Sequence, residues 1–412
     1  MKNARLIAFE TLHKIFTEGA YSHIVLDNAL QENDCDKSFV SALVYGVTER
    51  KITLDYYINK YLKSKTKPKV MTVLRLGAYQ ILFMDKVPDS AAINESVKLV
   101  KEIKQDYYAS LVNAVLHKIC DDNESVDDLS IKYSIPQELV NMWSKQYGKE
   151  ITESFLPFVN NRPPVFAVAN SLFVDSDELS YELLSEGIEN EIINTDVVMI
   201  TSAFDLKKSR TFNNGLFHIE DLSSYNCACA VKAKENDVVL DICSAPGGKA
   251  FTIAQKMNNK GHIYAFDLHS SRVKQIENGA ERLNISIIHA SVNDALEFSN
   301  EIPMADRILC DVPCSGFGII RRKPEIRYKN LDSISDMPQI QLKILETSSK
   351  YLKNNGTLVY STCTLNKKEN EKVVQSFLDK YKAFKLIEEK TVFPSEFGGD
   401  GFYYAVIKKY EN

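Results

Sequence analysis

A short segment in the second half of the chain constrains the fold more than any other. Residues 241–249, Asp-Ile-Cys-Ser-Ala-Pro-Gly-Gly-Lys, follow the apolar run 238–240 and precede 250–257, where apolar residues recur with helical spacing. This pattern predicts a buried strand, a tight turn and a helix. Glycines at such a turn let the backbone approach a ligand, and the first amides of the helix face the crevice beyond the strand. The turn suits a nucleoside cofactor, although glycine there often serves geometry alone.

The next predicted strand supports the cofactor interpretation. Residues 262–266 are followed by Asp267, nineteen positions after Gly248. In nucleotide-binding doubly wound folds, an acid at this position accepts hydrogen bonds from ribose hydroxyls. We therefore predict that the turn and Asp267 bind one nucleoside, in preference to Asp267 being only a solvated carboxylate at a strand end.

Strands and helices alternate through residues 226–412, which predicts a doubly wound parallel sheet, an α/β Rossmann-like domain. Asn366 and Glu369 have the spacing of a helix cap and its partner. The last apolar run is expected to add an antiparallel edge or inner strand. The expected strands are 238–243, 262–267, 285–289, 306–311, 356–362 and 402–407, and the expected helices are 249–257, 271–283, 338–353 and 367–379.

The first part of the chain has a different pattern. From residue 4 to about residue 119 every periodic segment is helical, which predicts an all-α bundle in 1–125. A small mixed α+β module is expected in 126–225. A chain of 412 residues is too long for one ordinary core, so several domains agree with its length. Within the module the expected strands lie near 165–174, 190–201 and 215–220, with a helix near 176–186.

Composition excludes several classes of protein. A hydrophobic content of 44% and a charged content of 25% are those of soluble globular proteins. No run reaches the length of a membrane span and the N-terminus lacks a signal-peptide core, so we expect a cytoplasmic protein without a membrane partner. The net charge is −5, but it is +4 in 1–120, −12 in 121–230 and +3 in 231–412. Two basic stretches, 60–69 and 321–329, are either solvated faces or phosphate-binding surfaces.

The cysteines point to chemistry and not to a structural metal. None of the eight forms a C-x-x-C pair or a cluster of zinc spacing, so we expect free thiols and no metal. Cys314 and Cys363 each lie at or beyond the end of a predicted strand, as does Asp311. Because carboxyl ends of neighbouring parallel strands gather at one edge, these three residues are expected to meet near the cofactor. Cys243 and Cys310 are expected to be small buried hydrophobes.

A thiolate beside an adenosyl cofactor indicates covalent activation of a poor carbon nucleophile. Cytosine C5 is such a nucleophile. Attack by sulfur at C6 makes C5 enamine-like, so that C5 can take a methyl group from S-adenosylmethionine. The C5 proton must then leave, and the sulfur must be eliminated.

Over essentially its whole length the sequence resembles the bacterial RNA (cytosine-5)-methyltransferases of the Fmu/Sun (RsmB) family, which modify small-subunit (16S) ribosomal RNA. Residues 1–120 resemble the NusB-like helical domain of that family, and for 1–125 the resemblance implies a domain that either binds RNA or braces the catalytic half. The motifs that carry the resemblance are Leu74-Arg-Leu-Gly-Ala-Tyr-Gln80 and Leu111-Val-Asn-Ala-Val-Leu116 in the first part, and Cys243 to Lys249, Asp311-Val-Pro-Cys314, Gly318-Ile-Ile-Arg-Arg322 and Tyr360-Ser-Thr-Cys363 in the second.

The resemblance implies roles for individual residues. Cys363 is the implied nucleophile, Cys314 assists product release, and Asp311 meets cytosine N3 and the amino end of the cofactor. Asp294 is the implied adenine contact, although Asn293 also fits the alignment. Glu220 stands where relatives often have Gln. The implied S-adenosylmethionine site comprises Cys243, Ser244, Ala245, Pro246, Gly247, Gly248, Lys249, Asp267, Asp294 and Asp311.

The basic stretch after Cys314 is expected to lie on a mobile loop that neutralises RNA phosphates. It follows two glycines, Gly316 and Gly318, and its expected RNA-binding residues are Arg321, Arg322, Lys323 and Arg327. The expected partner is small-subunit ribosomal RNA and the expected state is a monomer. Three alternatives remain: methylation of another RNA or a protein, a NusB-like regulator with a vestigial cofactor fold, and a nicotinamide oxidoreductase. The last lacks its G-x-G-x-x-G turn.

Overall fold

The computed structural model describes residues 3–122, 124–394 and 398–411. By the clustering of its contacts the chain forms two compact units. The helical unit comprises 1–161 together with 320–329, and the sheet unit comprises 162–319 together with 330–412. The ends of the predicted domains at residues 1 and 412 lie outside the described residues.

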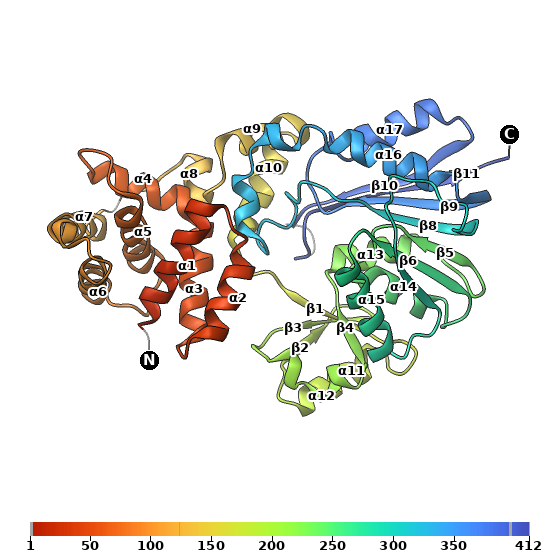
Figure 1. Cartoon of the computed structure of the whole chain (residues 1–412), viewed down its shortest axis with the longest axis horizontal. Coiled ribbons are helices and arrows are strands. Elements are labelled where there is room, and N and C mark those ends of the chain that lie inside the picture. The colour runs from red at the N-terminus through yellow and green to blue at the C-terminus, as the bar shows by residue number, and fades with distance from the viewer. Residues whose placement is uncertain (1–2, 123, 395–397, 412) are drawn as a thin grey trace. The chain divides into compact units, whose positions relative to one another are not determined.

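The predicted all-α bundle is confirmed in the helical unit, coloured red to orange in Figure 1. Asn3 caps the first helix through its side chain, and Gly19 ends it with a left-handed φ of 66°. Apolar residues from each helix form one core, including Leu12, Val44, Leu74 and Leu116. The seven helices are α1 (Ala4–Glu18), α2 (Ser22–Glu32), α3 (Lys37–Glu49), α4 (Lys51–Tyr61), α5 (Pro68–Phe83), α6 (Asp89–Glu102) and α7 (Ala109–Cys120), with the short η1 (Asp106–Tyr108) before α7.

The predicted module 126–225 is divided between the two units. Its first part is wholly helical and belongs to the helical unit. This part contains α8 (Leu129–Tyr133), α9 (Gln137–Tyr147), α10 (Lys149–Phe155) and η2 (Leu156–Asn160), and its core includes the tryptophan Trp143 packed edge-on against Phe155. The remainder supplies the small sheet of the other unit.

A segment from the second half of the sequence completes the helical unit. Residues 320–329, which include η4 (Pro324–Tyr328), are grouped with it. The Arg327 guanidinium is 1% exposed and donates to Glu49 O at 2.7 Å, Asn160 Oδ1 at 2.9 Å and Ser134 O at 3.2 Å. The Tyr328 hydroxyl donates to Thr48 O at 2.8 Å. These bonds fix the segment to the ends of several helices of the unit.

The sheet unit begins with a four-stranded antiparallel sheet of order β2-β3-β1-β4. It confirms the three strand-forming segments and the helix predicted there. Asn170, just after β1, is fully buried and donates from its side-chain amide to Gly215 O and Leu283 O at 2.8 and 2.9 Å. The elements are β1 (Val165–Ala169), α11 (Ser176–Ser185), β2 (Asn190–Ile192), β3 (Val197–Ile200), η3 (Leu206–Lys208), α12 (Arg210–Asn213) and β4 (Phe217–Ile219).

A seven-stranded sheet of order β10-β11-β9-β8-β5-β6-β7 carries the rest of the sheet unit. The strands from β9 to β7 run parallel. Strand β11 lies antiparallel between β9 and β10, which confirms the predicted antiparallel strand and makes it the inner of the two expected positions. The strands are β5 (Val238–Asp241), β6 (His262–Asp267), β7 (Ile288–Val292), β8 (Ala305–Asp311), β9 (Leu352–Thr362), β10 (Phe384–Val392) and β11 (Phe402–Lys409). The helices are α13 (Leu222–Ala230), α14 (Gly248–Lys256), α15 (Ser270–Arg282), α16 (Met337–Ser349) and α17 (Glu371–Lys380), with the short η5 (Leu331–Ile334) before α16.

The start of the last helix differs from the prediction. Helix α17 begins at Glu371 after Asn370, and Asn366 does not cap it. Asn366 instead donates from its side-chain amide to Glu369 at 2.8 Å, and both residues lie in the loop before the helix. Within the described part of the chain, no helix combines the length and the apolar character needed to cross a membrane.

Candidate active site

The turn after β5 is built as the sequence predicts. Strand β5 ends at Asp241 between two parallel neighbours, and α14 begins at Gly248. Gly247 has a φ of 108°, and a Cβ there would lie 2.5 Å from the Phe251 ring. Only glycine accepts this conformation at low cost. No side chain caps the helix, so its first amides face the carboxyl edge of the sheet, where a polar ligand can accept from them.

Two polar side chains at this turn have unmet hydrogen-bonding capacity. The Asp241 side chain is 1% exposed, and neither of its carboxylate oxygens has a hydrogen-bond partner among the described residues. The buried Ser244 Oγ likewise has no hydrogen-bond partner among the described residues. Burial raises the pKa of Asp241 to about 7, although Ser244 and Lys249 oppose the shift. Unsatisfied buried groups are costly, so these atoms are suited to a bound ligand.

Asp267 ends β6 beside this turn and is 5% exposed. Its carboxylate accepts from the backbone N–H of His269 at 3.2 Å and lies 3.4 Å from the Arg272 guanidinium. Strand β7 runs alongside, and the backbone N–H of Asn293 donates to Asp267 O at 3.1 Å. Asp294 is exposed, and its carboxylate accepts from the backbone N–H of Leu296 at 2.9 Å. The structure thus brings Asp267 and the 293–294 pair to one edge.

Asp311, at the end of β8, is held by two neighbours. The ammonium of Lys249 lies 2.7 Å from Asp311 Oδ2, and the hydroxyl of Ser361 donates to Oδ1 at 2.8 Å. Burial lowers the pKa of Lys249, but the charges of Asp311 and Glu220 outweigh burial and leave that pKa raised. The Lys249 side chain is 13% exposed and the Asp311 side chain 25%. Asp311 is therefore a partly accessible acceptor beside a buried ammonium.

Glu220, which departs from the pattern of relatives, lies behind the turn. Its carboxylate accepts from the Thr252 hydroxyl at 2.7 Å and lies 3.4 Å from His218 Nε2. A Cβ on Gly248 would come within 3.2 Å of Glu220 Oε1. Glu220 is 6% exposed and adds negative charge near Lys249. It therefore supports the lysine from beneath the turn.

The two predicted cysteines meet. Cys314 Sγ and Cys363 Sγ are 3.3 Å apart, and both side chains are partly exposed. The neighbouring Cys363 sulfur and burial together raise the pKa of Cys314 well above its usual value. Cys314 thus keeps its proton and can donate it toward the Cys363 sulfur. Cys310 is fully buried as expected, whereas Cys243 is only partly so.

Glu369 is a residue of the site that sequence analysis assigned to a helix cap. It is fully buried, and its carboxylate accepts from Ser315 N at 2.8 Å and Ser315 Oγ at 2.6 Å. It also accepts from Asn366 Nδ2 at 2.8 Å and from Gln341 Nε2 at 3.0 Å. The Ser315 hydroxyl lies 2.6 Å from that of Thr364. Ser315 follows Cys314 and Thr364 follows Cys363, so this network ties together the two loops that carry the sulfurs.

Gly318 adds a backbone tie to the loop that carries Cys363. Its N–H donates to Cys363 O at 3.0 Å, and its carbonyl accepts from Gly401 N at 3.0 Å. A Cβ on Gly318 would lie 1.9 Å from Gly401 O. The position requires glycine because the backbones approach so closely. Gly318 therefore serves close packing against the Cys363 loop.

The basic stretch after Gly318 is placed differently from the expectation of a mobile loop. Arg327 is enclosed in the helical unit, where carbonyls surround its guanidinium, so it is not available to a phosphate in this structure. Arg321 is 6% exposed and Arg322 is partly buried. Lys323 is exposed. A basic cluster in a sequence does not reveal which of its members a fold encloses.

The remaining predicted cofactor residues lie along the same turn. Ala245 is buried and its carbonyl accepts from the Arg272 guanidinium at 2.8 Å, whereas Pro246 is exposed. In the described part of the chain no three His, Cys, Asp or Glu side chains are grouped as metal ligands. The edge of the sheet thus combines a glycine turn, unsatisfied acceptors and a thiol pair.

The fold and site define a class: a Rossmann-like methyltransferase domain joined to a NusB-type helical domain. Residues 228–408 match the family model for the 16S rRNA methyltransferase RsmB/F, and residues 2–121 match that of the NusB family. A probable ribosomal RNA small subunit methyltransferase B from Bacillus subtilis is 36% identical, with 99% of each chain covered. The corresponding protein from Proteus mirabilis is 29% identical, again with 99% of each chain covered. The chain belongs to the ribosomal RNA small subunit methyltransferase B family.

Solved structures agree with this membership. The crystal structure of PH0851 matches with a TM-score of 0.82 and 26% identity over 99% of each chain. The structure of NSun6 from Pyrococcus horikoshii with SFG matches with a TM-score of 0.62 over 67% of this chain and 99% of that one. At 21% identity the latter likeness concerns the fold alone.

Proposed function

We propose that the protein transfers a methyl group from S-adenosylmethionine to C5 of a cytosine in small-subunit ribosomal RNA, through a covalent bond between Cys363 and C6. The observation that carries the proposal is the pair of sulfurs 3.3 Å apart at the carboxyl ends of β8 and β9, with Asp311 at the same edge. Neither a regulator nor an oxidoreductase has a use for this arrangement. Membership of the family supports the same substrate class.

The residues at the turn fit the proposed cofactor. Asp267 offers carboxylate oxygens to the ribose, and Asp294 or Asn293 lies beside it for the adenine. The uncapped amides of α14 suit the carboxylate of the methionine part of the cofactor. The unpaired side-chain oxygens of Asp241 and Ser244 can accept hydrogen bonds from its ammonium. When bound, the cofactor supplies the electrophilic methyl group.

The chain's own residues perform the remaining steps. The Cys363 thiolate forms a bond to C6, and the electron pair displaced from the C5–C6 bond makes C5 nucleophilic. Cytosine N3 must carry a proton when C6 is attacked, and the Asp311 carboxylate can then accept a hydrogen bond from N3–H, with Lys249 balancing its charge. After methylation at C5, a base removes the C5 proton, the double bond re-forms and the sulfur leaves C6.

Cys314 is assigned to the elimination. Its pKa is raised by the neighbouring sulfur and by burial, so it remains a neutral thiol while Cys363 attacks. A neutral thiol next to the Cys363 sulfur can return a proton to that sulfur as it leaves. The two cysteines thus act at opposite ends of the reaction.

Two single substitutions test this division. Cys363→Ala should bind RNA and cofactor but transfer no labelled methyl group and form no adduct, because C5 never becomes nucleophilic. Cys314→Ala should attack and methylate but fail to release, so protein and RNA accumulate as a slow band on a denaturing gel when S-adenosylmethionine is present. Labelled methyl transfer to unmodified small-subunit RNA, compared with other RNAs, measures the substrate.

A matched control is Cys310→Ala, a buried cysteine on β8 four residues before Cys314. It should retain turnover and form no persistent band. The opposite pattern, with Cys363→Ala trapped and Cys314→Ala inert, would exchange the two roles. Absence of methyl transfer to any RNA by the unchanged protein would reject the function itself.

A further inference from the structure

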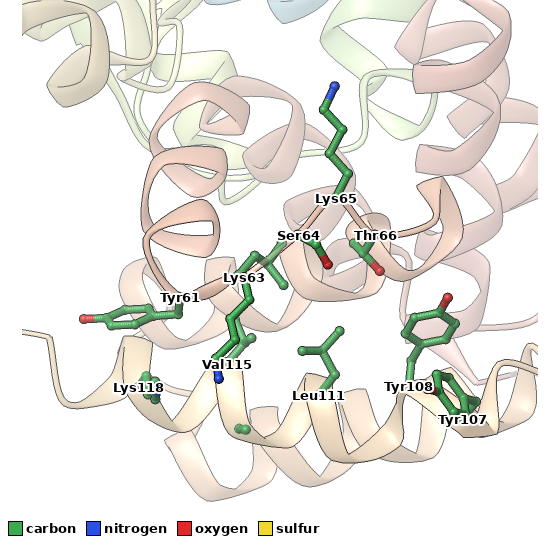
Figure 2. A pocket seen from close by; sticks show the side chains of 12 residues that line it. Tyr61, Lys63, Ser64, Lys65, Thr66, Tyr107, Tyr108, Leu111, Val115 and Lys118 are labelled. Carbon is green, nitrogen blue, oxygen red and sulfur yellow. The ribbon is translucent and has the colours of Figure 1, made fainter.

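A groove in the helical unit has the features of a nucleic-acid surface. It is a hollow of about 420 Å³ between the loop that joins α4 to α5, residues 62–67, and the face formed by η1 and α7. Figure 2 shows Tyr61 and Lys118 at one end, Tyr107 and Tyr108 at the other, and Leu111 between them. All of these residues belong to the helical unit. We call this hollow the tyrosine groove.

Aromatic rings at its ends are available to a ligand. Tyr107 is 91% exposed, and its ring meets that of Tyr108 edge-on with centroids 5.2 Å apart. The Tyr61 hydroxyl donates a hydrogen bond to Asp122 Oδ2 at 2.7 Å, which holds the Tyr61 ring in place. Because the Tyr107 ring is exposed, it adds no hydrophobic stabilisation to the core of the helical unit. Exposed rings of this kind stack on unpaired bases.

The charge on the groove is of one sign. Three lysines line it, Lys63, Lys65 and Lys118, and no acidic residue does. All three are exposed, as are Lys67 and Lys69 just beyond. Of the nearby acids, Asp122 and Glu124 hold Lys60 at 2.8 and 2.5 Å, whereas Asp106, next to Tyr107, is exposed. The basic stretch 60–69 thus places Lys63 and Lys65 on one loop, where they can meet phosphates. The exposed Lys67 lies beside them, with its ammonium 3.3 Å from Gln105 Oε1 and 5.5 Å from the centre of the Tyr108 ring.

A second hollow of similar volume lies on the other side of the same loop. Leu62, Lys65 and Thr66 line both hollows, so the loop forms a basic ridge between them. The second hollow contains Phe16 and again no acidic residue. A flexible strand can follow such a ridge and place bases on either side, whereas a duplex keeps its bases paired and has no use for the rings.

We propose that the tyrosine groove binds a single-stranded segment of the RNA substrate, with a base stacked on Tyr107 and phosphates along Lys63, Lys65 and Lys67. This step rests on the proposed function, under which RNA is the substrate. The helical unit then contributes affinity for RNA in addition to completing the fold. An acidic protein partner would use the lysines but not the ring.

The experiment uses the full chain and an unstructured RNA of about a dozen nucleotides, within the range that stacking grooves cover. Binding is followed by fluorescence anisotropy at several salt concentrations. Tyr107→Ala should weaken binding about tenfold, whereas Tyr107→Phe, which keeps the ring, should not. The triple variant Lys63→Ala/Lys65→Ala/Lys67→Ala should lower the slope of log affinity against log salt by about 2, since each phosphate contact on a single strand contributes about 0.7.

The matched control is Lys37→Ala/Lys98→Ala/Lys101→Ala, which removes the same charge from exposed positions of the same unit outside the groove. This control should change the slope of log affinity against log salt only slightly, through the change in net charge. Equal behaviour of the two triple variants would overturn the proposal, as would full affinity in Tyr107→Ala. Equal competition by duplex RNA or by an acidic peptide would overturn it in favour of a purely electrostatic surface.

Catalysis separates this proposal from the function on which it rests. Groove variants should raise KM for small-subunit RNA while keeping the rate at saturating RNA and the affinity for S-adenosylmethionine. If the unchanged protein methylates no RNA, the proposed function fails, but the oligonucleotide titrations still decide the groove.

Discussion

Two buried carboxylates in the sheet unit are treated in opposite ways. Glu369, behind the cysteine loops, accepts four hydrogen bonds from Ser315, Asn366 and Gln341. Asp241, at the cofactor turn, is equally enclosed, yet neither of its oxygens has a partner among the described residues. A saturated buried charge holds structure in place, whereas an unsaturated one is kept for a ligand. The contrast separates positioning from binding within one edge of the sheet.

Arg327 in the helical unit is a buried cation that is held in a similar way, but its Nε has no hydrogen-bond partner among the described residues. Its guanidinium is enclosed by acceptors from Glu49, Ser134 and Asn160, which lie far apart in the sequence. Both residues therefore depend on neutral dipoles from distant segments. The difference is what they hold: Glu369 holds two reactive loops, and Arg327 holds one segment against helices.

Replacing the fully hydrogen-bonded Glu369 carboxylate should have the largest effect. Glu369→Gln preserves volume but turns an –NH2 group toward donors that had an acceptor, which costs about 3 kcal/mol in the free energy of unfolding. The loops of Cys314 and Cys363 would shift, and a displacement of about 1 Å costs roughly a hundredfold in rate. Urea unfolding and single-turnover methyl transfer measure both quantities.

The control is Glu346→Gln on α16, whose carboxylate pairs with the exposed Lys380 at 2.8 Å. A surface pair of this kind contributes less than about 1 kcal/mol. Should Glu369→Gln lose stability but methylate at the normal rate, the network would be structural only and would not position the sulfurs.

Removing the buried guanidinium should have the next largest effect. Arg327→Met keeps an unbranched chain of similar length but leaves Glu49 O, Ser134 O and Asn160 Oδ1 without their donor. The loss of several acceptor partners, offset by the smaller cost of burying Met, predicts about 2 kcal/mol less stability. Thermal unfolding compared with Lys323→Met, an exposed neighbour in the same segment, measures the difference. Equal melting of the two variants would show that Arg327 does not hold the segment.

The sequence predicted most of the fold because its signals are local. Apolar runs at 238–240 and 358–360 placed β5 and β9, and the spacing from the glycine turn placed Asp267 at the end of β6. Strand ends of a parallel sheet meet at one edge, so the approach of Cys314 to Cys363 was also predictable. These features need only a few consecutive residues.

The rest depended on partners that are distant in the sequence. Asn366 and Glu369 have the spacing of a helix cap, but Ser315, fifty-four positions away, takes the carboxylate instead. Arg327 belongs to a basic cluster that predicts exposure, but carbonyls from far along the chain enclose it. The module 126–225 was divided because its helices complete the helical unit. No local pattern carries this information.

Replacing the unpaired Asp241 carboxylate should have the smallest effect, and it should raise the free energy of unfolding where the other substitutions lower it. Burial raises the pKa of Asp241 from 3.8 to about 7, so the folded protein holds the proton more tightly than the unfolded chain does. The free energy of unfolding therefore falls as pH rises from about 4 to about 7. Asp241→Asn removes this titration but adds an unpaired amide. We expect a net gain of about 1–2 kcal/mol at pH 8, and little or no gain at pH 5, in the ligand-free protein.

Urea unfolding of both proteins at pH 5 and pH 8 measures the difference in the free energy of unfolding. The same measurement with S-adenosylmethionine shows whether the ligand reverses that difference. If Asp241 receives the ammonium of the cofactor, the ligand should stabilise the unchanged protein more than Asp241→Asn, because only the carboxylate offers it a charge. Equal stabilisation of both proteins would mean that Asp241 is a strained buried acid outside the cofactor site. In that case the lack of hydrogen-bond partners at Asp241 would not mark a ligand-binding residue. Only the hydrogen bonds of Glu369 to the cysteine loops would then separate the two carboxylates.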